Sequence, residues 1–292
     1  MDIAERFQRF CSNLRMSDGV VENVVSRYHR ITRQLNESFR GTSNEDANSL
    51  YVGSYGRGTA ISVSDVDMLY VLPRDEYLRF SHYKWNGQSA MLQAVRDSIA
   101  RTFSRTKLKG DGQVVVVEFG DGICFDVVPC VSNLDGSYTY PDSNGGGMWK
   151  KTDPRSEINA IRNMDAKTNK NLRRLCRMIR AWKDQWDVPM GGLLIDTLAY
   201  NFLKDWPWRE KSFLYYDWLT RDFFEYLSKV NDQQSYWYAV GSNQQIQTKG
   251  RFSYKAKQTY NTAVTAIALD EQGCESLANQ KWRDIYGNKF GN

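Results

Sequence analysis

The sequence is poor in the residues that build structural zinc sites. It contains only two histidines, His29 and His82, among 292 residues. Its five cysteines are an odd number, and no two of them have the C-x-x-C spacing. Because such a site needs four clustered cysteine or histidine ligands, we do not expect structural zinc.

The sequence also lacks a long apolar run. No stretch reaches the roughly 18 apolar residues that a membrane-spanning helix needs. The first residues, MDIAERFQRF, are charged and amphipathic and contain no apolar segment of the signal-peptide kind. We therefore expect a cytoplasmic protein that does not contact a membrane.

Charge of one sign is only slightly in excess, because 39 Lys and Arg residues stand against 34 Asp and Glu residues. A protein that binds duplex DNA through a dense basic surface would carry more than this net charge of +5. The charge suits an anionic ligand such as a nucleotide, and it suits an ordinary, mildly basic surface equally well.

Helical periods and short apolar segments alternate in the first half of the chain. The expected helices span residues 17–39 and 88–106. The expected strands span residues 50–52, 66–73, 110–120 and 123–130. Segment 136–154 is rich in Gly, Ser and Pro, which predicts a loop between two lobes.

The second half of the chain has the apolar spacing of helices at 169–186, 193–203 and within 255–285. We therefore predict a mixed α/β catalytic core with N-terminal helices over residues 1–150. A helical lobe over residues 151–292 is predicted to pack tightly against it in one bilobed unit.

Two aspartates stand one residue apart where a loop enters an apolar strand. Alternation along the strand places Asp65 and Asp67 on one face, with Val66 opposite. Two carboxylates this close repel each other, and a cation between them removes the penalty. Mg²⁺ suits them because it takes oxygen ligands and recruits substrate phosphates. Asp126 lies in an equally apolar segment and joins the cluster if its strand lies beside the first.

A glycine and a serine follow the preceding strand directly. Gly53 lets the backbone approach a phosphate closely, and Ser54 can donate its hydroxyl and its N–H. Arg57 and Thr59 follow within reach and are predicted as further nucleotide contacts. A D-x-D pair alone is a weak signal because solvated turns often contain one, but this ordered set of motifs is specific.

At these residues the sequence resembles the DNA polymerase β-like nucleotidyltransferase superfamily, whose signature is h-G-[G/S], a spacer and D-h-[D/E]-h. VGS at 52–54, DVDM at 65–68 and FDVVP at 125–129 match it in order. The stretches GSYGRGTAI, NLRRLCRMIRAWKDQW, LIDTLAYNFL and KWRDIYGNKF further resemble the bacterial CD-NTases. These are relatives of animal cyclic GMP–AMP synthase that make cyclic oligonucleotides in the CBASS systems of anti-phage defence.

The resemblance implies a fold and a metal site. The fold is an α/β (α+β) nucleotidyltransferase core with a mixed or antiparallel sheet, followed by a helical C-terminal lobe, with a cleft between them. Asp65 and Asp67 would bind two Mg²⁺ ions, for which Mn²⁺ can substitute. Asp126 would bind one of these ions and favour deprotonation of the acceptor ribose hydroxyl. Gly53 and Ser54 would hold the donor triphosphate.

The family also places a basic residue of the long helix on the triphosphate, usually a lysine before an Ala-Trp pair. Arg180 stands at that position here, which suits phosphate but leaves Lys183 as a rival. A solvated helix face would explain both residues as well. Thr197 fits the hydroxyl of the next helix, with Asp196 beside it.

The implied activity joins nucleoside triphosphates, whether ATP, GTP or pyrimidine nucleotides, into a cyclic di- or trinucleotide that acts on a separate effector. The zinc-bearing insertion of the animal enzyme has no counterpart, so no dependence on duplex DNA is predicted. A regulatory protein partner is compatible with the family. Base specificity would lie in the helical lobe, where packing or surface roles still explain the candidates Asn163, Asn169, Asn171 and 236–238 more simply.

Two other functions remain open. The first is another transferase on the same core, either a linear oligonucleotide synthase or an enzyme that nucleotidylates tRNA, a protein or an antibiotic. The size of the helical half argues against the small members of that group. The second is a nucleotide-binding protein without catalysis, against which the three carboxylates argue.

Overall fold

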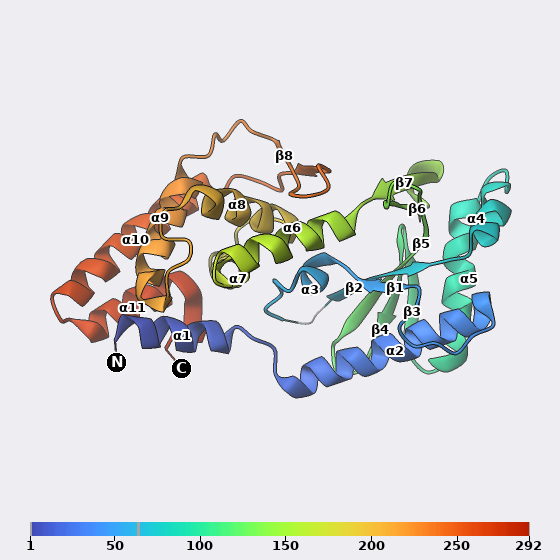
Figure 1. The fold of residues 1–292 in the computed structure, drawn as a ribbon, viewed down its shortest axis with the longest axis horizontal. Coiled ribbons are helices and arrows are strands. Elements are labelled where there is room, and N and C mark those ends of the chain that lie inside the picture. The colour runs from blue at the N-terminus through green and yellow to red at the C-terminus, as the bar shows by residue number, and fades with distance from the viewer. Residues whose placement is uncertain (1, 63–64, 292) are drawn as a thin grey trace. The chain divides into compact units, whose positions relative to one another are not determined.

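The computed structural model describes residues 2–62 and 65–291 (Figure 1). The chain forms two compact units. The sheet unit comprises Ser17–Gly56 and Val63–Arg155, and the helical unit comprises Met1–Met16, Arg57–Ser62 and Ser156–Asn292. The first helix and the segment 57–62 therefore belong with the C-terminal helices, whereas the sequence-based division places all residues up to 150 in one domain.

The sheet unit contains a seven-stranded mixed sheet. Its strands are β1 (Ser49–Tyr51), β2 (Asp65–Val71), β3 (Lys107–Asp111), β4 (Val114–Glu118), β5 (Cys124–Ser132), β6 (Tyr138–Asp142) and β7 (Met148–Thr152). The order β1-β2-β5-β4-β3 is antiparallel except for β2 and β5, which pair in parallel. The β6–β7 hairpin continues from the end of β5.

Four helices belong to the sheet unit, namely α2 (Asp18–Arg40), α3 (Gly53–Arg57), α4 (Arg74–Ser81) and α5 (Gly87–Thr102). Buried side chains of α2 and α5, such as Ile31 and Val95, pack with Val66 and Met68 of β2 and Val127 of β5 in one core. Alternation therefore turns the residues between them, including the aspartates, to the other face of the sheet.

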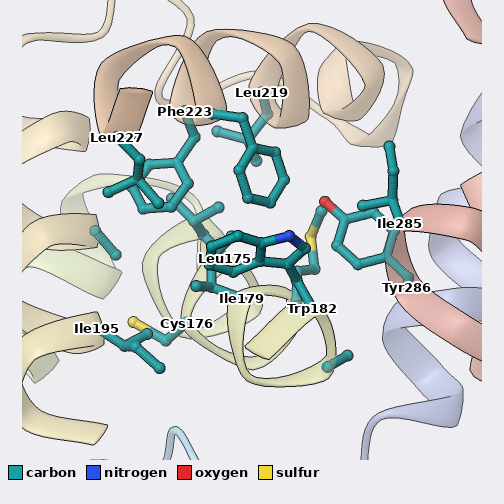
Figure 2. Close-up of a cluster of buried hydrophobic side chains, with 14 of the residues drawn as sticks. Leu175, Cys176, Ile179, Trp182, Ile195, Leu219, Phe223, Leu227, Ile285 and Tyr286 are labelled. Atoms are coloured by element: carbon teal, nitrogen blue, oxygen red, sulfur yellow. The ribbon is translucent and has the colours of Figure 1, made fainter. Parts of the chain in front are cut away.

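The helical unit contains α1 (Ile3–Asn13), α6 (Pro154–Lys167), α7 (Asn171–Trp186), α8 (Gly192–Asp205), α9 (Tyr216–Ser228), α10 (Ser253–Glu271) and α11 (Glu275–Tyr286). A small hairpin of β8 (Tyr236–Tyr238) and β9 (Gln245–Gln247) joins α9 to α10. Figure 2 shows Trp182 of α7 packed among Leu219 and Phe223 of α9 and Ile285 of α11. The indole N–H of Trp182 donates to the hydroxyl of Thr259 at 2.8 Å, which satisfies its polar atom inside the core.

Helix α1 belongs to this core because of its two phenylalanines. The Phe7 ring packs edge-on against Trp282, with 5.1 Å between ring centroids, and the Phe10 ring lies 4.6 Å from that of Tyr286. Both phenylalanines are fully buried. The N-terminal helix therefore completes an aromatic cluster that the C-terminal helices cannot close alone.

The expected α/β half followed by a helical half is confirmed, with two local corrections. Residues 110–120 are not one strand, because the chain turns at Gly112, whose φ is +58°, between the antiparallel strands β3 and β4. Residues 136–154 are not a loop between lobes. Their glycines make the turn of the β6–β7 hairpin, in which Tyr138 pairs with Thr152. No helix of the described residues is long and apolar enough to cross a membrane.

Candidate active site

The three predicted aspartates lie on the parallel pair of strands in the sheet unit. The register of β2 and β5 sets Asp65 opposite Cys124 and Asp67 opposite Asp126. Because paired residues on neighbouring strands point to the same face, Asp67 and Asp126 lie side by side. Asp65 comes two residues before Asp67 and shares that face. The sheet thus brings together residues that are 59 positions apart in the chain, as the Asp67–Asp126 pairing shows.

The electrostatics of Asp126 reflect this crowding. Burial first, and then the charges of Asp67, Asp65 and Asp111, raise the pKa of Asp126 to about 6. A bound cation favours the charged form of a carboxyl group and would reverse this shift. The oxygen-only donor set therefore fits Mg²⁺.

The described side chains do not already form a closed metal site. Among residues 2–62 and 65–291, no group of three or more His, Cys, Asp or Glu side chains is drawn together tightly enough to hold a metal ion. The fit to Mg²⁺ therefore rests on the strand register and on the repulsion felt by Asp126.

Gly53 lies directly against this carboxylate face. Its φ is +59°, a conformation that favours glycine, and a Cβ atom at this position would lie 1.8 Å from Oδ2 of Asp67. The Val52 N–H donates to the Asp67 carbonyl at 2.9 Å, which fixes the strand end beside β2. Helix α3 begins at Gly53, so Ser54 lies in its first turn. A larger residue at this position would require the Asp67 side chain to move.

Three other predicted nucleotide contacts meet at one buried carboxylate in the helical unit. Nε of Arg57 donates to Oδ2 of Asp196 at 2.8 Å, and the Thr59 hydroxyl donates to the same oxygen at 2.9 Å. Nη1 of Arg180 donates to Oδ1 of Asp196 at 2.6 Å. Burial alone would raise the pKa of Asp196, but the charges of Arg180 and Arg57 lower it to about 2.

The remaining two predicted contacts differ in accessibility. Lys183 retains a partly exposed side chain, and its amine lies 3.3 Å from a carboxylate oxygen of Asp184. Thr197 is fully buried, and its hydroxyl has no hydrogen-bond partner among the described residues. Arg180, by contrast, does not lie on a solvated helix face, because its side chain is buried in the ion pair with Asp196.

Two buried acids of this cluster are not among the predicted nucleotide contacts: Asp196, which was noted only as a neighbour of Thr197, and Glu157. Glu157 is buried and accepts from Nη1 of Arg57 at 3.3 Å and from the Ser242 hydroxyl at 2.9 Å. A usable signal was present for Asp196, because it is a lone acid within the apolar helix LLIDTLAYNFL. A carboxylate buried in this way requires a cationic partner.

The candidate base-reading residues belong to the helical unit. The amide nitrogen of Asn171 donates to the carbonyls of Arg209 and Lys211, and its oxygen accepts from the Tyr216 hydroxyl at 2.6 Å. Asn171 is therefore a buried structural residue. Tyr236 and Tyr238 are exposed on the β8–β9 hairpin.

The protein-family model of the Second Messenger Oligonucleotide or Dinucleotide Synthetase (SMODS) domain matches residues 1–165. The chain belongs to this family. The matched region contains the strand–glycine–serine turn and all three aspartates of the sheet unit, so the family match and the carboxylate geometry concern the same residues.

A curated protein is also similar in sequence to this chain. A Bacillus cereus (strain VD146) protein named a probable cyclic nucleotide synthase is 24% identical over 177 residues, which is 57% of this chain and 51% of that protein. The matched part thus spans about half the length of this curated relative.

Solved structures share the fold over the whole chain. Escherichia coli MS115-1 CdnC with ATP has a TM-score of 0.66 at 15% identity, covering 100% of this chain and 99% of CdnC. CdnC has also been solved in a complex with HORMA-deltaN. Vibrio cholerae DncV, a cyclic AMP–GMP synthase, has a TM-score of 0.63 at 15% identity, covering 99% of this chain and 87% of DncV. At these identities, the likeness establishes the fold of the chain.

Proposed function

We propose that this protein is a nucleotidyltransferase that joins nucleoside triphosphates into a cyclic di- or trinucleotide second messenger for anti-phage defence. The observation that carries the proposal is the register of β2 and β5, which sets Asp67 beside Asp126 with Asp65 on the same face. The SMODS family match covers this face, and CdnC, which has the same fold, holds ATP.

The proposed reaction is attack of a ribose hydroxyl oxygen of one nucleotide on the α-phosphorus of another. The new P–O bond forms as the bond to the β-phosphate breaks, and pyrophosphate leaves. To close a dinucleotide ring, the ribose hydroxyl at one end of the linear product attacks the α-phosphorus of the triphosphate at its other end, and a second pyrophosphate leaves. A trinucleotide adds one more nucleotide by the first reaction before the ring closes. Bound Mg²⁺ would supply charge neutralisation at the triphosphate and at the attacking oxygen.

The side chains of this sheet have distinct proposed tasks. Asp65 and Asp67 would hold both ions, with Mn²⁺ as a substitute, and Asp126 would hold one and orient the acceptor hydroxyl so that its proton is lost. The first turn of α3, with Gly53 and Ser54, would bind the donor triphosphate through backbone N–H groups and a hydroxyl. Glycine allows this turn to approach Asp67 without displacing its carboxylate.

The predicted nucleotide contacts in the helical unit differ in how far their side chains are exposed. Lys183 offers an amine that remains partly exposed, so it is the stronger proposed triphosphate contact. Arg57, Thr59 and Arg180 would contact nucleotide only by leaving their hydrogen bonds to Asp196. The Thr197 hydroxyl has no hydrogen-bond partner among residues 2–62 and 65–291, and a polar group of a ligand would satisfy it.

The test is product analysis. The protein is incubated with Mg²⁺ and an equimolar mixture of radiolabelled ATP, GTP, CTP and UTP, and products are treated with phosphatase and identified by mass spectrometry. The proposal expects a phosphatase-resistant cyclic product from wild type and none from Asp67→Asn. Asp97→Asn, the same change at an exposed carboxylate paired with Arg96, should retain the product.

Other outcomes separate the alternatives. A phosphatase-sensitive ladder would identify a linear oligonucleotide synthase, and label on added tRNA, protein or antibiotic would identify another transferase. CdnC forms a complex with HORMA-deltaN. If the protein alone gives no product, the assay is therefore repeated with the protein products of neighbouring genes added as candidate partners. Absence of any product in that setting contradicts the proposal.

A further inference from the structure

The helical unit contains a basic cavity of about 550 Å³ that none of the proposed catalytic residues lines. Its walls come from the end of α1, from α7 with the turn before it, and from the segment before α9. Four arginines and one lysine line it, namely Arg15, Lys170, Arg173, Arg174 and Arg177. This volume lies within the range of pockets that hold small molecules.

The positive charge in this cavity is poorly compensated. Asp165 is the acidic residue of its lining, and it accepts from the backbone N–H of Arg173 at 2.9 Å. Within the described part of the chain, Arg15, Lys170 and Arg177 form no ion pair with a carboxylate. Cations gathered without counter-charges repel one another, and an anion would relieve that repulsion.

Arg177 has a buried donor that nothing in the protein satisfies. Its Nη2 donates to the Gly58 carbonyl at 2.7 Å, but its Nε is buried and has no hydrogen-bond partner among the described residues. Burial first, and then the charges of Arg15 and Arg173, lower the pKa of its guanidinium. An unsatisfied buried donor on a charged group is costly, so this nitrogen marks a place for an acceptor atom.

The cavity also contains an aromatic surface. Phe213 lines it, and the guanidinium of Arg174 lies 4.7 Å from the centre of the Phe213 ring. Arg174 is held in place by donation to the Asn169 carbonyl at 3.1 Å. A planar guanidinium fixed in this way presents a donor edge to a phosphate or carboxylate group.

The same arginines hold the segment that follows α3. Nε of Arg173 donates to the Arg57 carbonyl at 2.9 Å, next to the bond from Arg177 to Gly58. Arg57 is the last residue of α3, the helix that begins at Gly53. An anion that draws these guanidinium groups toward itself therefore changes the hydrogen bonding of residues 57–62.

We propose that this basic cavity binds a small organic polyanion, a molecule of nucleotide size with at least two phosphate or carboxylate groups, and that binding alters the hydrogen bonding of residues 57–62. None of the residues that line this cavity belongs to β2 or β5. It does not depend on whether the protein makes a cyclic nucleotide.

The test is isothermal titration calorimetry in EDTA, which removes metal-dependent nucleotide binding, with inorganic tripolyphosphate and citrate as separate probes. The test variant is Arg15→Glu/Lys170→Glu, which reverses two exposed charges of the cavity. The control is Lys204→Glu/Lys257→Glu, which makes the same charge change at exposed lysines elsewhere in the helical unit. Thermal unfolding of both variants verifies folding, and Arg15→Gln/Lys170→Gln replaces the test variant if it unfolds.

We expect wild type and control to bind at least one probe with affinities within about twofold of each other, and the test variant to bind at least about tenfold more weakly, because attractive contacts become repulsive. A preference for tripolyphosphate assigns the site to phosphate ligands, and a preference for citrate assigns it to carboxylates. Hydrogen exchange of residues 57–62 should change when the probe binds to wild type. Absence of binding to wild type, or equal binding by both double variants, overturns the proposal.

Discussion

The pKa values of two aspartates in this protein are shifted in opposite directions. Asp126 in the sheet unit faces other carboxylates, and its pKa is raised to about 6. Asp196 in the helical unit faces two guanidinium groups, and its pKa is lowered to about 2 despite complete burial. The charges that raise the pKa of Asp126 are those of other carboxylates, whereas Asp196 has two guanidinium groups as counter-charges.

This difference indicates which carboxylate contributes to activity and which contributes to folding stability. A carboxylate that faces other carboxylates, as Asp126 does, costs stability unless a cation binds, which is the behaviour expected of a functional site. A compensated carboxylate, such as Asp196 with Arg57, Arg180 and Thr59, holds helices and a loop together. Changes in the sheet unit should therefore affect activity, and changes around Asp196 should affect folding.

The largest effect is expected for Asp67→Asn. Product formation should fall by about 10² to 10³-fold, the size expected for loss of one preorganised electrostatic group. The midpoint of thermal unfolding in EDTA should stay level or rise, because the repulsion with Asp126 disappears. Product assays and melting curves check this against Asp97→Asn. Loss of stability together with activity would break the comparison.

Asp196→Ala should give the opposite pattern. Removing this carboxylate leaves Arg180 buried without its counter-charge and leaves Arg57 with Glu157 alone, so the free energy of unfolding should fall by about 3 to 5 kcal/mol. Urea unfolding measures this loss. Asp284→Ala is the control, because it removes an exposed carboxylate paired with Lys281 and should cost less than about 1 kcal/mol. Equal losses for both variants would contradict the structural role of Asp196.

Gly53→Ala sharpens the comparison within the sheet unit. Gly41 has a similar φ of +64° but nothing within 4 Å of a Cβ, whereas a Cβ at Gly53 meets the Asp67 carboxylate. Both alanine variants should lose about 1 kcal/mol of unfolding free energy to backbone strain. Only Gly53→Ala should lose activity, by roughly 10² if Asp67 moves by an ångström. Similar activities in both variants would show that the close contact has no functional role.

The smallest effect is the dependence of stability on pH. The raised pKa of Asp126 means that the folded state holds this proton up to about pH 6, whereas the unfolded chain loses it near 3.8. Wild type should therefore lose stability as pH rises through this window. In EDTA, the advantage of Asp126→Asn should grow from pH 4 to about 1 kcal/mol above pH 6, allowing for solvent screening at a half-buried site.

Urea unfolding at pH 4, 5, 6 and 7 measures this advantage, with Asp97→Asn as the control. A constant difference across the range would contradict the repulsion. The lowered pKa of Asp196 has the opposite sign, since its stabilisation is present above pH 3.8 and is lost only as pH falls toward 2.

The common face of Asp65 and Asp67 could be predicted from the sequence because its evidence is local. Two-residue spacing places Asp65 and Asp67 on one face, and the structure places them so. The family pattern was needed to choose Asp126 among nearby acids such as Glu118, which instead pairs with Lys107 and Lys109. Strand register, which the sequence does not encode locally, decides this choice.

The basic residues were harder to place because a guanidinium can pair with any carboxylate within reach. Nothing near Arg57 or Arg180 in the sequence indicates that both meet Asp196, which is 139 positions from Arg57. The glycine-rich segment 136–154 was wrongly predicted for a similar reason, since a turn within a hairpin and a loop between lobes have the same composition. Pairing partners, as for Tyr138 with Thr152, become visible only in the folded sheet.

The most direct test of the carboxylate cluster is a Mn²⁺ titration followed by electron paramagnetic resonance, in the presence of a non-hydrolysable ATP analogue. Wild type and Asp97→Asn should bind Mn²⁺ alike, while Asp67→Asn and Asp126→Asn should each bind at least about tenfold more weakly, as for loss of one metal ligand. Equal Mn²⁺ affinity in all four proteins would contradict the account.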